Sequence, residues 1–289
     1  MCNLPTPINA VFSMFTRRAG APSNYKCSLR GALHAQHNML PHKRLRVVLQ
    51  TLYANITGDP ILLFRNVTIE TDPRLGVVDI VSNTTTTTTS PARATIGGSG
   101  TTVEGLFRIS DNAHVLLVRV YVEGGVGGRG GCFYVSEGTL LLNDVILRRH
   151  VSIQGGAIYL EDGGRASMTA TNSTTFLNNQ ARTELWDGIA SGGAIYVGRG
   201  NIIVIRDVLF LNNQALADRA SSFGGALDVW GSASIVNSRF INNVALGPDD
   251  IGYSPTKSVG AGMLMGGELG GCSESPLAIV LIFLCLSLL

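Results

Sequence analysis

Residues 155–160 read GGAIYL, and nearly the same six letters return as GGAIYV at 192–197 and as GGALDV at 224–229. Each copy is followed by a Phe-x-x-Asn tetrapeptide, which reads FLNN, FLNN and FINN in turn. The second glycine precedes that Phe by 20, 17 and 15 residues, so this half of the unit has a nearly fixed length. A unit this short cannot bury an apolar face alone, and repeated units of this kind stack on one another.

The letters within a unit alternate between two sides, as in a β-strand. In GGAIYL, Ile158 and Leu160 are expected to point into the core, whereas Ala157 and Tyr159 point the other way. Asp228 stands in the Tyr159 position of the third copy, which indicates that this second side faces water. Strands stacked about 4.8 Å apart would join the inward residues into one column. With the outlying copies GGCFYV and GAGMLM, that column is Phe133, Val135, Ile158, Leu160, Ile195, Val197, Leu227, Val229, Met263 and Met265.

The other repeated letters have their own physical causes. A corner between strands needs backbone with positive φ and leaves little room for a Cβ, which glycine supplies without strain. The Phe is expected to stack inside the coil, with Leu147 in its place in the first unit, and the Asn amide to bond to the next coil. His150 occupies the Asn position of the first unit, so the ladder is expected to begin one coil later. These motif positions are Gly155, Gly156, Ala157, Ile158, Phe176 and Asn179, then Gly192, Gly193, Ala194, Ile195, Phe210 and Asn213, then Gly224, Gly225, Ala226, Leu227, Phe240 and Asn243.

The alternation of GGA[IL] with FxxN is similar to the repeat of the polymorphic outer membrane proteins, which are chlamydial surface proteins with extracellular relatives elsewhere. The resemblance covers roughly residues 125–265. It implies an all-β fold, a right-handed parallel β-helix displayed at a cell surface, where it serves in adhesion or as an envelope component. We therefore expect an irregular basic segment at 1–49, the β-helix at 50–265, and a small-residue linker with a short hydrophobic tail at 266–289.

Composition agrees with such a solenoid and excludes other classes. The chain of 289 residues has 35 glycines, 45% apolar residues and only 15% charged residues, which favours β structure with many tight corners. The net charge of +2 hides an uneven distribution, because residues 1–58 hold seven bases and no acid while the remainder is mildly acidic. Nucleic-acid binding would need a basic face on the folded part, so the sequence predicts no nucleic-acid partner. The five cysteines have neither metal-site spacing nor the density of a disulfide framework.

The two ends of the chain leave its location open. There is no clear signal peptide: before Arg17 the chain offers only AVFSMF, short of the about 7–15 apolar residues that a secretory signal needs. Residues 1–45 fit an organelle transit peptide about as well, or are not the natural start. As a helix, the uncharged tail 276–289 would cover about 20 Å of a hydrocarbon core of about 30 Å. The tail is read as a lipid-anchor signal, a short or truncated membrane anchor, or a buried strand.

Sequons and exposed loops indicate where an exported protein would be modified and where it would bind. Four Asn-x-Ser/Thr sequons, at Asn55, Asn66, Asn83 and Asn172, are candidate glycosylation sites. The variable inserts 181–191, 214–223 and 244–259 are expected to carry partner contacts, because the coil fixes everything else. Trp186 and Trp230 are candidates for contact with a glycan or a protein, or they pack against a neighbouring coil.

The sequence favours a non-catalytic protein of the cell surface or extracellular space, which contacts an unknown surface protein or glycan and attaches to the membrane through its tail. The alternative is a polysaccharide lyase or hydrolase on the same scaffold, with Asp144 and Asp207 as carboxylates. These two lie two coils apart, about 10 Å, which is too loose for a shared metal. The acids at 187, 249 and 250 lie in loops. We expect no catalytic residue, cofactor or metal; a third class is an intracellular organelle scaffold.

Overall fold

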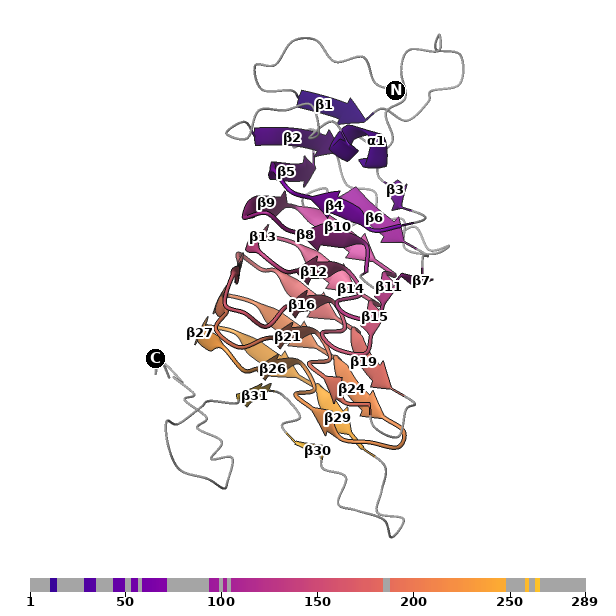
Figure 1. Cartoon of the computed structure of the whole chain (residues 1–289), viewed down its shortest axis with the longest axis vertical. Helices are drawn as coiled ribbons and strands as arrows, with labels where there is room; N and C mark the ends of the chain where they lie inside the picture. Colours follow the sequence, from indigo (N-terminus) through magenta and orange to yellow (C-terminus); the bar gives the residue numbers. More distant parts are fainter. Residues whose placement is uncertain are drawn as a thin grey trace, which may run out of the picture.

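The structure is a computed structural model, and it forms a stack of coils that are nearly all β-strand (Figure 1). The described residues are 11–14, 29–34, 44–49, 53–56, 59–71, 94–98, 101–102, 105–183, 188–247, 258–259 and 263–265. Side chains are described for all of these ranges except 11–14, 53–56, 94–98, 101–102, 258–259 and 263–265. The statements below concern these residues.

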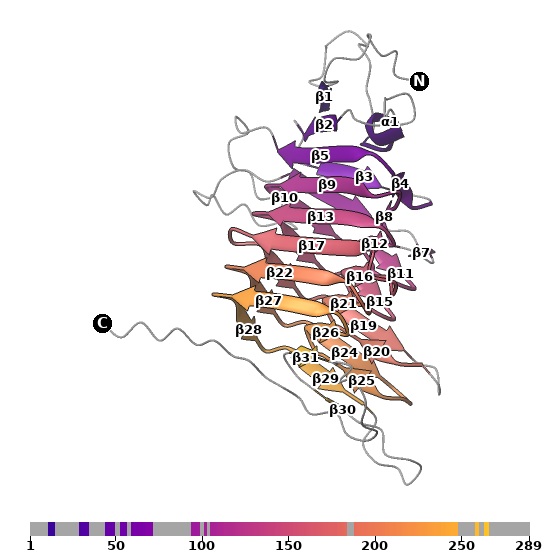
Figure 2. The ribbon, with the colours of Figure 1, turned by 60° about the vertical axis from the view of Figure 1, so that its left-hand side comes forward.

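Successive turns of the chain contribute strands to four sheets, which we name A to D. Figure 2 shows the strands of one sheet lying one above the other in sequence order. Sheet A contains β1 (Val11–Met14), β2 (Arg44–Leu49), β5 (Asn66–Thr71), β9 (Ala113–Val118), β13 (Gly138–Asn143), β17 (Ala166–Thr171), β22 (Ile202–Arg206) and β27 (Ser232–Val236). Sheet B contains β3 (Tyr53–Ile56), β6 (Ala94–Gly98), β10 (Val120–Glu123), β14 (Ile146–Arg148), β18 (Thr175–Leu177), β23 (Leu209–Leu211) and β28 (Arg239–Ile241).

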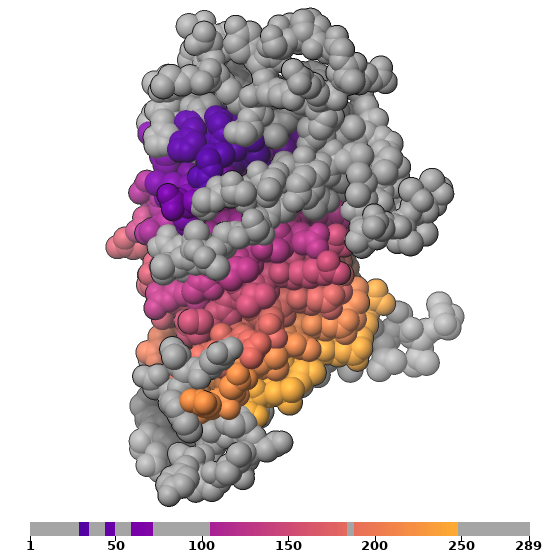
Figure 3. Space-filling view, turned by 90° about the vertical axis from the view of Figure 1, so that its right-hand side faces the viewer, coloured from indigo at the N-terminus to yellow at the C-terminus, as the bar shows by residue number. Residues whose placement is uncertain are grey.

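The other two sheets close each coil. Sheet C contains β4 (Ile61–Leu63), β8 (Phe107–Ile109), β12 (Phe133–Val135), β16 (Ile158–Leu160), β21 (Ile195–Val197), β26 (Leu227–Val229) and β31 (Met263–Met265). Sheet D contains β7 (Thr101–Thr102), β11 (Val126–Gly127), β15 (Val151–Ser152), β19 (Gln180–Thr183), β24 (Gln214–Ala217) and β29 (Val244–Leu246). Neighbouring strands pair in parallel, as in β12 with β16 and β16 with β21. The parallel β-helix that the sequence predicts is therefore confirmed, and its coils appear as parallel bands in Figure 3.

The Phe column packs inside the coils. Leu147 pairs with Phe176 in register, and Phe176 with Phe210, which pairs in turn with Phe240. The ring centroids of Phe176 and Phe210 lie 4.8 Å apart at 4°, and those of Phe210 and Phe240 lie 4.6 Å apart at 2°. Phe176 and Phe210 are fully buried in the main core. One internal column of rings is the arrangement expected of stacked coils.

Both glycines of the repeated pair are needed, for different reasons. The first has positive φ, 61° in Gly155 and Gly192, where side chains rarely fit. The second allows close approach between coils, because a Cβ on Gly193 would lie 2.0 Å from the carbonyl oxygen of Gly225. Non-bonded atoms do not approach this closely, so any side chain at Gly193 would push the coils apart.

The Ala of GGA[IL] faces the core, contrary to the alternation that we expected from the sequence. Ala157, Ala194 and Ala226 are fully buried in the main core. The N–H groups of Ala157 and Ile158 both donate to the single carbonyl of Ala194, at 2.8 and 3.0 Å. Two residues thus oppose one, as in a β-bulge, and the alternation restarts at the strand. This is why Ala157 and Ile158 can both point inward.

Regular structure begins before residue 50, where the sequence pattern places its start. β2 pairs with β5 over its whole length and buries Leu45, Val47 and Leu49. The helix α1 (Leu29–His34) buries Leu29, Ala32 and Leu33 within the main core. The basic residues of this segment conceal a period-two pattern in RLRVVL, which is why the composition alone indicates an irregular stretch.

The variable inserts also contain stacked strands. A fifth sheet, sheet E, contains β20 (Ala190–Ser191), β25 (Ser222–Phe223) and β30 (Ser258–Val259). Between sheets D and E lies a small core of alanines, Ala181, Ala190, Ala215, Ala217, Ala220 and Ala245. The described parts of the inserts therefore extend the coil. The sequence did not predict this extension, because the inserts differ in length.

Removing one ring from the Phe column should cost a large part of the stability. We expect Phe210→Ala to lower the free energy of unfolding by about 3–5 kcal/mol, because it leaves a cavity between two rings. The neighbouring Leu211 is half-buried and lies on the outward face of the same strand, so Leu211→Ala should cost about 1 kcal/mol or less. Urea unfolding of both variants checks this, and equal losses would contradict the stacked core.

Candidate functional site

The last Asn of each Phe-x-x-Asn tetrapeptide forms a buried column that we name the asparagine ladder (Asn179, Asn213 and Asn243). The Nδ2 group of Asn179 donates to Oδ1 of Asn213 at 3.0 Å, and that of Asn213 donates to Oδ1 of Asn243 at 2.9 Å. The same oxygens also accept the backbone N–H groups of Asn179 and Asn213. Each Nδ2 further donates to a carbonyl of the preceding coil, as Asn213 does to Phe176. The ladder therefore satisfies buried backbone groups at the same corner of successive coils.

His150 extends this ladder by one coil instead of interrupting it, which corrects our expectation that the ladder starts at Asn179. Its Nε2 lies 3.0 Å from the carbonyl oxygen of Val122, and its Nδ1 accepts the N–H of Gly125 at 3.0 Å. The imidazole thus carries its proton on Nε2 and reproduces the donor and the acceptor of an Asn amide. The backbone N–H of His150 itself donates to Oδ1 of Asn179. Burial lowers the pKa of His150 to about 4.

The outward side of sheet C is covered, whereas the sequence indicated that it faces water. Tyr134, Tyr159 and Tyr196 are only 4–9% exposed and form a cluster of their own. Their ring centroids lie 5.5 and 4.9 Å apart, and the guanidinium of Arg129 lies 5.3 Å from the Tyr159 centroid. The rings cover one another, and burial raises the pKa of Tyr196.

Asp228 ends this tyrosine column and is fully buried. Its Oδ2 accepts the indole N–H of Trp230 at 3.4 Å, and Oδ1 has no hydrogen-bond partner among the described residues. Burial raises its pKa to about 6, against smaller opposing effects of hydrogen bonds from Ser191 and Trp230. Trp230 is 41% exposed, with the Arg199 guanidinium 5.6 Å from its ring. Trp230 therefore packs against Arg199 and still exposes part of its ring for contact with a glycan or a protein.

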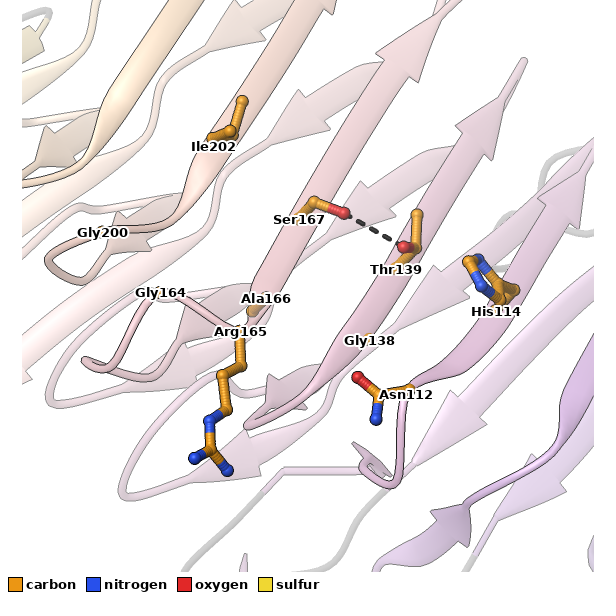
Figure 4. Close-up of a pocket in the computed structure, with 10 residues that line it drawn as sticks. All are labelled: Asn112, His114, Gly138, Thr139, Gly164, Arg165, Ala166, Ser167, Gly200 and Ile202. Atoms are coloured by element: carbon orange, nitrogen blue, oxygen red, sulfur yellow. Dashed lines mark hydrogen bonds between the residues drawn. The ribbon is translucent and has the colours of Figure 1, made fainter.

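A shallow groove of about 240 Å³ crosses the outer face of sheet A (Figure 4). His114, Thr139, Ser167 and Ile202 lie in register on four successive strands and point out of the sheet in one row. The groove is lined by Asn112, His114, Gly138, Thr139, Gly164, Arg165, Ala166, Ser167, Gly200 and Ile202. No motif search points to this row, although the shared register of His114, Thr139 and Ser167 could have been found by aligning the strands between repeats.

A comparison with protein families finds a match over the segment that contains the first FLNN and the second GGAI. Residues 173–198 match the family model described as the Chlamydia polymorphic membrane protein (Chlamydia_PMP) repeat. This segment is similar to a single polymorphic membrane protein repeat. No curated protein and no solved structure matches the chain. The matched polymorphic membrane protein repeat runs from the corner before Phe176 to the end of β21, so it includes one rung of the Phe column, one rung of the asparagine ladder and one glycine pair.

The corners between sheets A and B account for the two carboxylates considered for catalysis. Asp144 and Asp207 have φ of 55° and 56°, and they lie between the strands of sheets A and B. Ser173 and Asn237 take the same left-handed conformation in neighbouring coils. Short polar residues are the non-glycine residues that adopt this conformation most readily. A corner requirement therefore explains why Asp occurs at both positions.

The remaining candidate residues are placed only in part. Asn172 is an exposed corner residue whose Nδ2 donates to Oδ1 of Asn143, and Asn66 Oδ1 accepts the N–H of His114. The side chain of Asn55 lies outside the described residues, as do Asn83, Trp186 and the tail 276–289. Glycosylation at the four sequons stays a prediction.

The described residues contain neither a membrane-spanning helix nor a cluster of metal ligands. No helix among them has the length and apolar character needed to cross a membrane. No group of three or more His, Cys, Asp or Glu side chains among them could hold a metal ion.

His150 should make the fold sensitive to acid. Its pKa is lowered from the ordinary value of 6.5 to about 4 in the fold, so the stability from the neutral ring is complete above pH 6.5 and is lost as the pH falls toward 4. The loss should be about 3 kcal/mol. His150→Asn keeps the ladder and does not titrate, so it should remove this loss in urea unfolding at pH about 7 and about 4.5. The same change at the exposed His114 is the control, and an unchanged pH dependence in His150→Asn would contradict the ladder role.

Asp228 should change the stability with pH in the opposite direction from His150. Because its pKa is raised from 3.8 to about 6, the fold favours the neutral acid, and this contribution is lost as the pH rises through 6. Asp228→Asn should therefore raise the free energy of unfolding at pH about 7 by about 2–3 kcal/mol, with little effect near pH 4. Asp207→Asn, at an exposed corner that tolerates Asn one coil later, is the control. Equal gains at both pH values would disprove the buried ionisation.

Proposed function

We propose that the protein is a non-catalytic, surface-exposed β-helix protein that makes adhesive or envelope contacts through its outer flanks. The polymorphic membrane protein repeat at 173–198 supports this proposal, since that family suggests a surface-exposed outer membrane protein. Catalysis is not required to explain the repeated residues of the coil interior, because Phe, Asn and Gly at their repeated positions each serve stacking.

The buried ladders decide which residues remain available for binding. The Phe column uses the inward side chains of sheet B, and the asparagine ladder occupies the corner between sheets B and D. The tyrosine column uses the outward side of sheet C. The outer face of sheet A and the exposed Trp230 remain open to solvent. Partner contacts should therefore concentrate there and on the inserts, and the partner is a surface protein or a glycan.

Labelling of intact cells tests the surface location. We expect an antibody against an epitope tag inserted after Gly163, in an exposed turn, to label intact cells of the source organism. A tag on a cytoplasmic protein is the control for cell integrity. If labelling requires permeabilised cells, the surface proposal is wrong. Deletion of residues 276–289 in the same strain should release the protein into the medium if the tail attaches it to the membrane.

A further inference from the structure

The groove on sheet A is lined mainly by polar side chains that can form hydrogen bonds. The imidazole of His114 and the hydroxyls of Thr139 and Ser167 stand side by side, with the two hydroxyl oxygens 3.0 Å apart (Figure 4). Arg165 is held by Glu137 at 2.5 Å. Ile202, 55% exposed, supplies an apolar surface at one end of the row.

The groove is hollow because glycines replace side chains along one side. Gly164 and Gly200 have φ of 72° and 77°, and a Cβ on Gly200 would lie 2.9 Å from the Cα of Gly164. Asn201 fixes this edge, since its Oδ1 accepts the N–H of Ala166 and its Nδ2 donates to the carbonyl of Glu161. A site whose backbone is already held in place loses little entropy when a ligand binds.

The row runs across the strands, parallel to the stack of coils. Four side chains on strands about 4.8 Å apart span roughly 14 Å, so the groove fits an extended ligand that offers polar groups at regular intervals. From this geometry we propose that the groove binds a neutral oligosaccharide chain, lying along the axis of the β-helix. The proposal rests on the surface location proposed above, because only there would the groove meet such polymers.

Other extended ligands fit this groove less well. A peptide that adds a strand needs an unpaired sheet edge, whereas β13 and β17 are paired on both sides. A nucleic acid needs several free cations, whereas Arg165 is paired with Glu137. A stable protein partner buries about 800 Å² per side around an apolar centre, whereas this groove is small and its central residues are polar.

Binding of purified full-length protein to immobilised neutral oligosaccharides tests the proposal. The probes are short β-linked oligomers of glucose, mannose, galactose and N-acetylglucosamine, with uronic acid oligomers for comparison. We expect binding to a neutral probe that is weakened about fivefold by Thr139→Ala or by Ser167→Ala, since each removes about one hydrogen bond. Thr169→Ala is the matched control, because it removes an outward hydroxyl from the same strand outside the groove.

A second variant separates a blocked groove from a lost hydrogen bond. Ser167→Trp fills the middle of the row and should abolish binding while the unfolding transition stays that of the wild type. The proposal is overturned if no neutral probe binds, if uronic acid oligomers alone bind, or if Thr169→Ala weakens binding as much as Ser167→Ala. Such a result leaves the surface location untouched, since that is tested on cells without any glycan.

Discussion

The asparagine ladder is the interaction on which the regularity of the coils depends. An amide carries a donor and an acceptor on one planar group, so it can bond to an identical amide above it and below it. Asn213 does this, donating to Asn243 and accepting from Asn179, while its side chain also satisfies two backbone groups of the preceding coil, the N–H of Asn179 and the carbonyl of Phe176. Because a buried unpaired group is costly, a shift of one coil by a single residue would break several of these bonds at once. The ladder thus fixes the register that the flat Phe rings alone would leave free to slide.

The substitutions within the ladders show which property each position requires. His150 replaces an amide because a neutral imidazole also offers one donor and one acceptor, on opposite sides of the ring. It does so only while it is uncharged, so the coil gains an acid-sensitive rung. Asp228 replaces a tyrosine at the end of its column, where one carboxylate oxygen has no hydrogen-bond partner in the part of the chain that the structure describes. One site loses stability when it gains a proton and the other when it loses one, so their effects on the pH dependence of folding partly cancel.

The interior could be predicted from the sequence, whereas the exterior could not. Each internal column depends only on the spacing of one residue type, which can be read from the sequence. This holds for the rings of Phe176, Phe210 and Phe240 and for the amides of the asparagine ladder. The burial of Tyr159 and Asp228 depends on which groups cover the sheet from outside, and period-two alternation carries no information about that. The inward position of Ala157 depends on a bulge, because two N–H groups share one carbonyl. Sheet E was missed since its strands are two residues long and lie in inserts of unequal length.

The groove on sheet A shows the same difference between the interior and the exterior of the coil. Its floor arises from turns around Gly164 and Gly200, which are absent from the GGA[IL] and FxxN motifs and were therefore given no role in the sequence. Yet these turns stack only because the strands that follow them, β17 and β22, are held in register by the interior. The internal ladders fix the register of the strands, so His114, Thr139 and Ser167 lie in a straight row whatever residues occupy these positions. Outward residues of such a coil can therefore change from one unit to the next while the spacing between them stays fixed, which is the property that a surface for repetitive ligands requires.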